Sequence, residues 1–464
     1  MTAESSRTGS ALAAQPYAGR MPARVGDMAV ETHGIAPIPP GNRYGTARRL
    51  FTVWFAPQVN MTVVFTGTLA IVLGLGFWLG LLAMVIGTVV GCLAVGYLST
   101  WGPRTGTAQL PNARMAFGGT VAVVAVIQWL SSIAWDGLVG LFGGEALAEL
   151  LGMPFWLAVV IVLAAQGVVG VLGYEVIHRV QAVMTVVLIV TFAIFAVKLV
   201  TGHQVVTAPT LAGADLSGAF VLEVTIALSL AISWASYASD YSRYLPVNTS
   251  RTAVFGYTFA GLAVAYIAVQ AIGVAGAEVL TDQTAQGIRS IMGGGVLGAL
   301  ALIVVALSSV ASNAMNDYSG SLALQTVGVR VRRPVSAVVV VVMAFALIMW
   351  LHSGDMAGRF QGVLLFVSYW IPAFVAIVAI DWRYRSAGRE EVNPAEESTG
   401  RADAWVALGV FLVAFAAAVP FMHTNLIVGP VAAALHGADL AYFVNFLVAG
   451  ALYGGYRVWR VRRS

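Results

Sequence analysis

The sequence predicts an all-α integral membrane protein with 12 transmembrane helices. Hydrophobic residues make up 59% of the 464-residue chain and charged residues only 10%, whereas a soluble protein carries about 25% charged residues. Apolar runs of roughly 20 residues, the length that crosses a bilayer, occur twelve times. The basic residues between these runs gather on alternate connections, as they do in proteins that cross the membrane repeatedly.

The apolar runs follow one another along most of the chain. Their approximate limits are 51–75, 77–99, 117–147, 155–174, 180–200, 218–245, 252–279, 295–328, 335–352, 360–382, 404–424 and 440–459. The third and eighth runs are longer than a bilayer requires, so we expect them to tilt or to extend past it. Residues 1–45, rich in Ala, Pro, Gly and Ser, contain no such run and are predicted to form a disordered cytoplasmic tail.

The distribution of basic residues predicts the orientation of the chain. If the N-terminus is cytoplasmic, 22 of the 25 Lys and Arg residues lie in the tail, in cytoplasmic connections or at the C-terminal end. Only Lys198, Arg289 and Arg359 lie on the other side. We therefore expect a multi-pass protein of the cell membrane (plasma or inner) with both termini in the cytoplasm. The single cysteine, Cys92, excludes a disulfide framework or a cysteine metal cluster.

Two apolar runs change character near their middle. In 51–75 a tryptophan, Trp54, is followed by the segment Ala56-Pro57-Gln58-Val59-Asn60, and in 218–245 Trp234 stands among Ser233, Ser236 and Ser239. Pro57 removes a backbone donor and should interrupt its helix. Interrupted segments at matching places in the two halves of a transporter point to a binding site at mid-membrane. Gln58, Asn60 and Ser233 are therefore candidate substrate-binding residues.

Two other runs carry polar side chains at membrane depth. In 295–328, Ser309, Ser312, Asn313 and Asn316 follow helical spacing and share one face. A buried carboxamide such as Asn316 offers both donors and an acceptor to an amide-bearing heterocycle, although hydrogen bonding between helices is the alternative. Asp136, in 117–147, is costly in a membrane unless it is paired or hydrated. It is a functional candidate, with a helix cap or an ion pair as the alternative.

Several motifs, taken together and in order, resemble the nucleobase:cation symporter family, specifically its purine–cytosine permease branch. They cover about three quarters of the chain: Trp54 to Thr68, Thr100 to Gly106, Ala116 to Gly118 with Ala134-Trp135, Trp234 to Pro246, Asn313 to Ser319, and Ser368 to Trp370 with Asp381-Trp382. Two positions depart from the fungal members. Val139 stands where they have Asn, and Ala56 where they often have Ser.

The resemblance implies a leucine-transporter-like fold, with two inverted five-helix repeats and two peripheral helices. The repeats would be 46–200 and 215–385, followed by a cytoplasmic loop at 386–403 and the last two helices with a basic end at 404–464. It implies uptake of a cytosine- or purine-type nucleobase, or a related heterocycle, by symport with Na⁺ or H⁺. Trp135 and Trp234 match the aromatic pair that stacks on the ligand, and Asn316, with Asn313 beside it, matches the carboxamide that reads its edge.

Two kinds of group could couple transport to a cation. In this fold a cation usually lies between the first and eighth helices. Here the carbonyl groups of Ala56 and Val59 and the hydroxyl groups of Ser309 and Ser312 are the candidate ligands. Oxygen ligands without a carboxylate favour sodium. Proton coupling would instead require a titrating group, for which Asp136 is the candidate.

The sequence is also compatible with other cargoes, and it argues against an enzyme. The same fold could carry a hydantoin, an allantoin, an amino acid or a vitamin-like amide. No basic residue lies at mid-membrane to hold a carboxylate, which favours a neutral ligand. A membrane-embedded enzyme would need a convergent His, Cys or carboxylate cluster, which the sequence lacks. We expect no cofactor beyond the coupling cation, no nucleic-acid partner and no obligate protein partner. The only partners expected are the small nucleobase-like substrate and the lipid bilayer.

Overall fold

The computed structural model describes residues 34–463 except 172–173, 282–283, 329–332, 387–390 and 395–398. Most of the predicted tail and part of the predicted loop 386–403 therefore lie outside the described residues. In the described part of the chain the regular secondary structure is helical, apart from one isolated bridge between His423 and Val428.

The first half of the chain forms the helices that correspond to the first five apolar runs. The first run is divided into α1 (Arg49–Phe55), the 3-10 turn η2 (Ala56–Gln58) and α2 (Met61–Val72). The next four runs form α3 (Gly76–Ser99), α7 (Val121–Leu151), α8 (Phe155–Val171) and α9 (Tyr174–Gly202). Short helices α4 (Gly102–Thr105), α5 (Gln109–Asn112), α6 (Arg114–Phe117) and η3 (Gly118–Thr120) connect α3 to α7.

The second half supplies the remaining seven runs. The sixth forms α10 (Gly213–Ile232) with the 3-10 helix η4 (Ser233–Tyr237), and the tenth forms α16 (Met356–Phe366) and α17 (Ile371–Arg385). The others are α11 (Arg251–Ala275), α14 (Gly295–Val327), α15 (Arg333–His352), α18 (Arg401–Ala418) and α20 (Ala441–Val461). The short elements are η1 (Pro40–Asn42), α12 (Ala277–Leu280), α13 (Thr284–Ile291), η5 (Val419–Phe421) and α19 (Pro430–Ala434).

The twelve predicted spans are consistent with these helices. By length and composition, eight helices of the described chain are long and apolar enough to cross a membrane, and the bent pair Arg49–Gln58 and Met61–Val72 makes a ninth. Two shorter apolar helices, Phe155–Val169 and Val338–His352, coincide with the fourth and ninth runs. The twelfth run coincides with α20, which is long enough to span but falls outside the group of eight.

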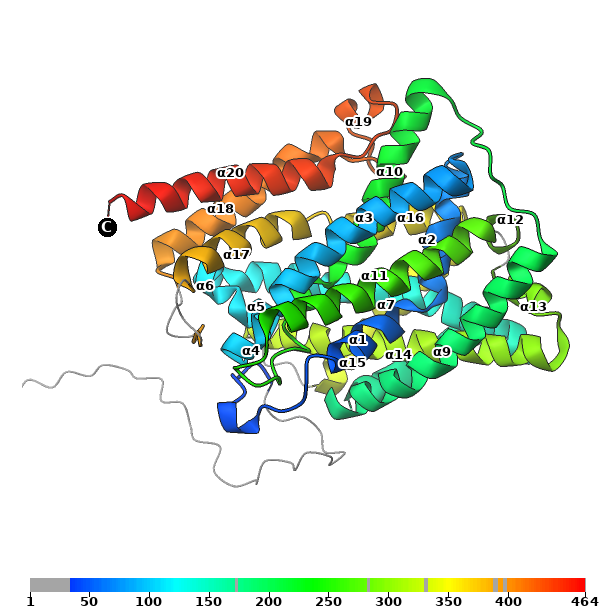
Figure 1. The fold of residues 1–464 in the computed structure, drawn as a ribbon, viewed down its shortest axis with the longest axis horizontal. Coiled ribbons are helices and arrows are strands. Elements are labelled where there is room, and N and C mark those ends of the chain that lie inside the picture. The colour runs from blue at the N-terminus through cyan, green and yellow to red at the C-terminus, as the bar shows by residue number, and fades with distance from the viewer. Residues whose placement is uncertain are drawn as a thin grey trace, which may run out of the picture.

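The long helices lie side by side in one bundle, with α18 and α20 at one edge (Figure 1). The C-terminal end of α20 and the first described residues lie toward the same end of the bundle, which we call the terminus side. The opposite end carries α12, α13 and the connection from α9 to α10. The bundle is densely packed where glycines allow helices to touch. A Cβ at Gly87 would lie 2.2 Å from the Val224 carbonyl oxygen, and one at Gly273 would lie 1.9 Å from that of Val64.

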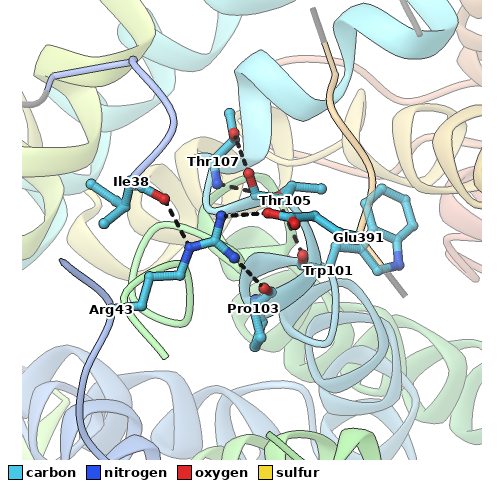
Figure 2. A network of polar contacts seen from close by, with 7 residues as sticks. All are labelled: Ile38, Arg43, Trp101, Pro103, Thr105, Thr107 and Glu391. Carbon is cyan, nitrogen blue, oxygen red and sulfur yellow. Dashed lines mark hydrogen bonds and ion pairs between the residues drawn. The ribbon is translucent and has the colours of Figure 1, made fainter. Parts of the chain in front are cut away.

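A network around Arg43 ties three segments together on the terminus side (Figure 2). The Arg43 guanidinium donates to the Ile38 carbonyl at 2.8 Å, to the Pro103 carbonyl at 2.7 Å and to the Glu391 carboxylate at 3.2 Å. Burial lowers the pKa of Arg43, and the ion pair with Glu391 acts against this shift. The segment before α1, the connection from α3 to α7 and the connection from α17 to α18 are thus held at one point.

Candidate functional site

The first span is interrupted where the sequence predicts. Its two halves, on either side of η2, meet at an angle of 58°. Asn60 caps α2, because its side-chain oxygen accepts from the Val63 backbone N–H at 3.1 Å and its amide donates to the Pro57 carbonyl at 2.5 Å. Asn60 therefore stabilises the break itself. Gln58 is buried in η2, and its side-chain Nε2 has no partner among the described residues.

The sixth span also changes at its predicted position. Regular α-helix ends at Ile232, a 3-10 helix carries Ser233 to Tyr237, and turns follow as far as Tyr244. The Ser233 hydroxyl donates to the Leu230 carbonyl at 2.8 Å and so turns back onto its own helix. Tyr241, in the turns, donates to the Met315 carbonyl of α14 at 3.1 Å. The interrupted part of the sixth span is thus attached to the eighth.

Aromatic side chains gather at the two breaks. The Trp234 ring lies 5.6 Å from the Trp54 ring at an interplanar angle of 80° and 5.6 Å from the Tyr237 ring at 66°. Neither neighbour stacks in parallel on Trp234, whose Nε1 donates to the Tyr266 hydroxyl at 2.7 Å. Trp135 is 8% exposed, and it takes part in none of the ring pairs of the described chain. The structure therefore places Trp234 at the breaks and leaves the ring faces of both tryptophans without a parallel aromatic partner.

A polar network joins α7 to α14. The Asn313 amide donates to the Asp136 carbonyl at 3.1 Å and to Gln166 of α8 at 2.7 Å. Asn316 donates to the Asn313 side-chain oxygen at 3.2 Å and also hydrogen-bonds the Asp136 carboxyl group. The Asp136 and Asp317 carboxyl groups hydrogen-bond each other. Asn313 and Asn316 thus meet Asp136, as a shared site requires.

The two candidate hydroxyl ligands for a cation have different surroundings, and Ser312 is the one in contact with the first break. The Ser312 hydroxyl donates to the Pro57 carbonyl at 3.1 Å, which connects α14 to η2. The Ala56 carbonyl already accepts the Val59 N–H at 3.1 Å. Ser309 is buried, and its hydroxyl has no partner among the described residues. The position of a Cβ on Gly143 of α7 would lie 2.9 Å from that hydroxyl oxygen, so Ser309 faces α7.

Several functional candidates are absent from the sequence-based set. Asp317 stands beside Asn316 in the sequence and four residues after Asn313, a spacing that could have identified it as a partner of that face. Tyr237 accepts a hydrogen bond from Gln128 of α7, and Trp54 lies against Trp234. Sequence alone gave no sign of Gln166, because a single glutamine in an apolar helix usually serves packing.

Buried polar atoms with unused hydrogen-bonding capacity surround the breaks. Most buried polar atoms in proteins have partners, so each exception requires an explanation. No group of three or more His, Cys, Asp or Glu able to hold a metal occurs among the described residues. The atoms without partners in this region, within the same described chain, are Trp54 Nε1, Gln58 Nε2, Gln128 Oε1, Asp136 Oδ1, Ser309 Oγ and Asp317 Oδ2.

Comparisons with known proteins agree with this architecture. YxlA of Bacillus subtilis (strain 168) is 26% identical over 443 residues, 92% of this chain and 95% of that protein. Purine-cytosine permease fcyB of Emericella nidulans is 25% identical over 457 residues, 92% of this chain and 88% of that protein. Mhp1, a nucleobase-cation-symport-1 family transporter solved in a closed conformation with bromovinylhydantoin bound, is 18% identical, with a TM-score of 0.71 over 93% of this chain and 96% of Mhp1.

The likeness to Mhp1 shows the fold. The inward-facing conformation of Mhp1 gives a TM-score of 0.74 over 94% of this chain and 95% of that one. This confirms the predicted leucine-transporter-like architecture of two inverted five-helix repeats with two additional helices. Residues 37–445 match the family described as permease for cytosine/purines, uracil, thiamine, allantoin, so the chain is a multi-pass membrane protein that belongs to this family of nucleobase:cation symporters.

Proposed function

We propose that the protein imports a cytosine- or purine-type nucleobase, or a closely related heterocycle, by symport with a cation. The observation that carries this proposal is the set of unpartnered polar atoms beside aromatic rings at the two breaks. A planar heterocycle has apolar faces and a rim of donors and acceptors. Ring faces and uncharged amide or hydroxyl groups suit such a ligand, and a partner for each buried polar atom removes the cost of leaving it unpaired.

In this proposal some of the predicted substrate residues contact the ligand, and the others hold those residues or the breaks in place. Trp135 and Trp234 stack on the ligand, while Asn316 and Gln58 hydrogen-bond its edge. Asn313 holds Asn316 in place through the hydrogen bond between their side chains. Asn60 and Ser233 shape the breaks, because their side chains are bound to neighbouring backbone groups. Hydantoin, allantoin and vitamin-like amides have the same chemistry, and the family description and the ligand of Mhp1 support them as alternatives.

We propose the proton as the coupling cation. Two carboxyl groups can hydrogen-bond each other only if at least one carries a proton, and Asp136 and Asp317 make that contact at the site. Sodium is the second candidate, supported by the Ser309 hydroxyl and by the contact of Ser312 with the first break. Its ligands would be those two hydroxyls with the carbonyls of Ala56 and Val59.

The proposed setting is the cell membrane, with both termini in the cytoplasm and the two repeats at 46–200 and 215–385. The distribution of basic residues supports this orientation. On a Cys92→Ala background, we expect Gly202→Cys and Ser353→Cys to react with a membrane-impermeant maleimide added outside intact cells. Arg401→Cys should react only after permeabilisation. Labelling of Arg401→Cys in intact cells would contradict the proposed orientation.

Uptake into proteoliposomes tests the function directly. Labelled cytosine, adenine, hypoxanthine, uracil, allantoin and benzylhydantoin should be compared under a sodium gradient alone and under a pH gradient alone. We expect accumulation of at least one nucleobase driven by one of these gradients and abolished by an ionophore that collapses it. Accumulation of benzylhydantoin or allantoin, but of no nucleobase, would show that the substrate is one of these alternatives. A protein that moves none of these compounds, in either uptake or counterflow, would contradict the proposed function.

A further inference from the structure

Glu223, in α10, is a buried carboxyl group without a partner. Its side chain is 0% exposed, and neither carboxyl oxygen has a hydrogen-bond partner among the described residues. An ionised carboxylate in such a place would lose its hydration and gain no hydrogen bond or counter-charge in return. Glu223 therefore carries a proton in this conformation. Nothing in the substrate site described above accounts for it.

Within the described ranges, the elements that pack most on α10 offer Glu223 no compensating charge. They are chiefly α2, α3, α16 and η4. Helix α2 has no titratable residue, and the titratable residues of α3 and η4 are Cys92, Tyr97 and Tyr237. The one charged residue of α16 is Arg359, whose guanidinium donates to the Trp350 carbonyl and the Ser353 hydroxyl. On the connection from α18 to α20, the carboxylate of Asp439 accepts from the backbone N–H groups of His423 and Ala441.

A cavity of about 330 Å³ lies one turn from Glu223, at the start of α10. Ala219 and Leu222 of α10 line it, together with Asp215, His423 and His436. Side chains on an α-helix lean toward its N-terminus, so the Glu223 side chain extends toward the turn of Ala219, which borders the cavity. The volume is enough for several water molecules at about 30 Å³ each. Water in this cavity would be one helical turn from the carboxyl group.

Two histidines and an aspartate stand in the cavity wall. His436 Nδ1 lies 2.8 Å from Asp215 Oδ1, and His423 Nδ1 lies 2.5 Å from the Gly437 carbonyl oxygen. Histidine is the side chain whose ordinary pKa lies closest to neutral pH. The cavity is built from the ends of α2 and α10 and the connection from α18 to α20, away from the terminus side. In the proposed orientation it faces the outside.

We propose that Glu223 is a proton-binding site of the transport cycle, loaded from the outside through this cavity. The proposal rests on the proposed function and adds a second protonation site to it, on a different helix from Asp136 and Asp317. A proton from water forms an O–H bond with the Glu223 carboxylate when the outer half of the bundle is open to water. Closure buries the group only in its neutral form, so the conformational change is linked to proton uptake. Reopening to the outside or the inside returns the proton to water.

The test is Glu223→Gln, which keeps the size of the side chain and fixes it in an uncharged form. In proteoliposomes loaded with a pH-sensitive dye, wild type should move protons with labelled cytosine. We expect Glu223→Gln to lose cytosine-dependent proton movement and accumulation driven by a pH gradient, falling at least tenfold, while counterflow of cytosine continues. Counterflow requires folding, substrate binding and the conformational change, but no net proton transfer. Glu223→Asp, which retains a carboxyl group, should recover part of the proton movement with a shifted pH profile.

Glu149→Gln is the matched control. Glu149 lies on the same side of the bundle, paired with Arg289 at 2.8 Å, and its replacement is the same exchange of a carboxyl group for an amide. We expect it to keep proton-coupled uptake. Wild-type proton movement in Glu223→Gln would overturn the inference, as would loss of counterflow together with coupling in both Glu223 variants. Wild-type accumulation driven by sodium alone would refute the proton site and leave the proposed function standing. Absence of any uptake or counterflow in wild type would refute both.

Discussion

Replacement of Trp234 by alanine is expected to weaken binding of the transported base by roughly 5- to 150-fold. The estimate comes from about 1–3 kcal/mol for stacking a base on an aromatic side chain, with a tenfold change in Kd for each 1.4 kcal/mol. Among the residues that the structure describes the ring has no parallel partner, since Trp54 and Tyr237 approach it at 80° and 66°. A planar ligand can therefore use a face of this ring. Quenching of tryptophan fluorescence or a direct binding assay on detergent-purified protein measures the change.

Variants separate stacking from the packing role of the same side chain. Trp234 is buried and donates to the Tyr266 hydroxyl, so alanine also removes protein contacts. Trp234→Phe loses that hydrogen bond but keeps an aromatic face, and it should bind more tightly than Trp234→Ala. Tyr266→Phe removes only the hydroxyl partner and should have the smallest effect. If Trp234→Ala retains the wild-type Kd on properly inserted protein, Trp234 is not part of the site.

The second predicted stacking residue has a control on its own helix. Trp129 lies six residues before Trp135 on α7 and is also partly buried, but six residues place it on a different face of the helix. Trp135→Leu should weaken binding, whereas Trp129→Leu should leave the Kd unchanged. Equal losses in the two variants would mean that α7 responds to any loss of a large side chain, and Trp135 would lose its assignment.

The spans and the breaks could be predicted from the sequence because the bilayer restricts the possibilities. A segment that crosses lipid must satisfy its own backbone groups and be apolar over about 20 residues, so length and composition are enough to find it. The interruption at Pro57 was predictable for a similar reason, since proline has no N–H to donate. The short helices between α3 and α7 were not predicted. They lack the length and the apolar periodicity that identify a span.

The partners of the site residues were much harder to predict. Spacing placed Asn313 and Asn316 on one face, but it could not show that Asn313 is held by Gln166 of a different helix or that Asn60 caps α2. Asp317 follows Asn313 by four residues and so starts close to the same face, but this spacing could not show which carboxyl group of another helix it would meet. Its contact with Asp136 depends on how closely α14 packs on α7, which the sequence of either helix alone does not determine.

Asp136→Asn and Asp317→Asn are each expected to abolish accumulation driven by a pH gradient. The two carboxyl groups share a hydrogen bond and have no cation beside them among the described residues, so they behave as one site that must hold a proton. Asparagine keeps the size and can still hydrogen-bond, but it cannot exchange that proton. Accumulation of labelled base should fall to the level without a gradient. Counterflow should persist with an altered affinity, because Asn316 contacts Asp136.

A double variant distinguishes a shared site from two independent acids. The readout is the affinity in counterflow, which each single variant retains. If the pair acts as a unit, Asp136→Asn with Asp317→Asn should change this affinity no more than either single variant, whereas independent groups would give additive changes. Asp355→Asn is the matched control, since Asp355 is an exposed helix cap whose role asparagine also fills. Sodium-driven uptake could instead persist in both Asp variants and be lost in Ser309→Ala and Ser312→Ala. This result would show that sodium, bound at the two hydroxyl groups, is the coupling cation. Hydroxyl and carbonyl oxygens can bind a sodium ion without changing their protonation. Coupling to protons instead requires a group that gains and loses a proton, as a carboxyl group does.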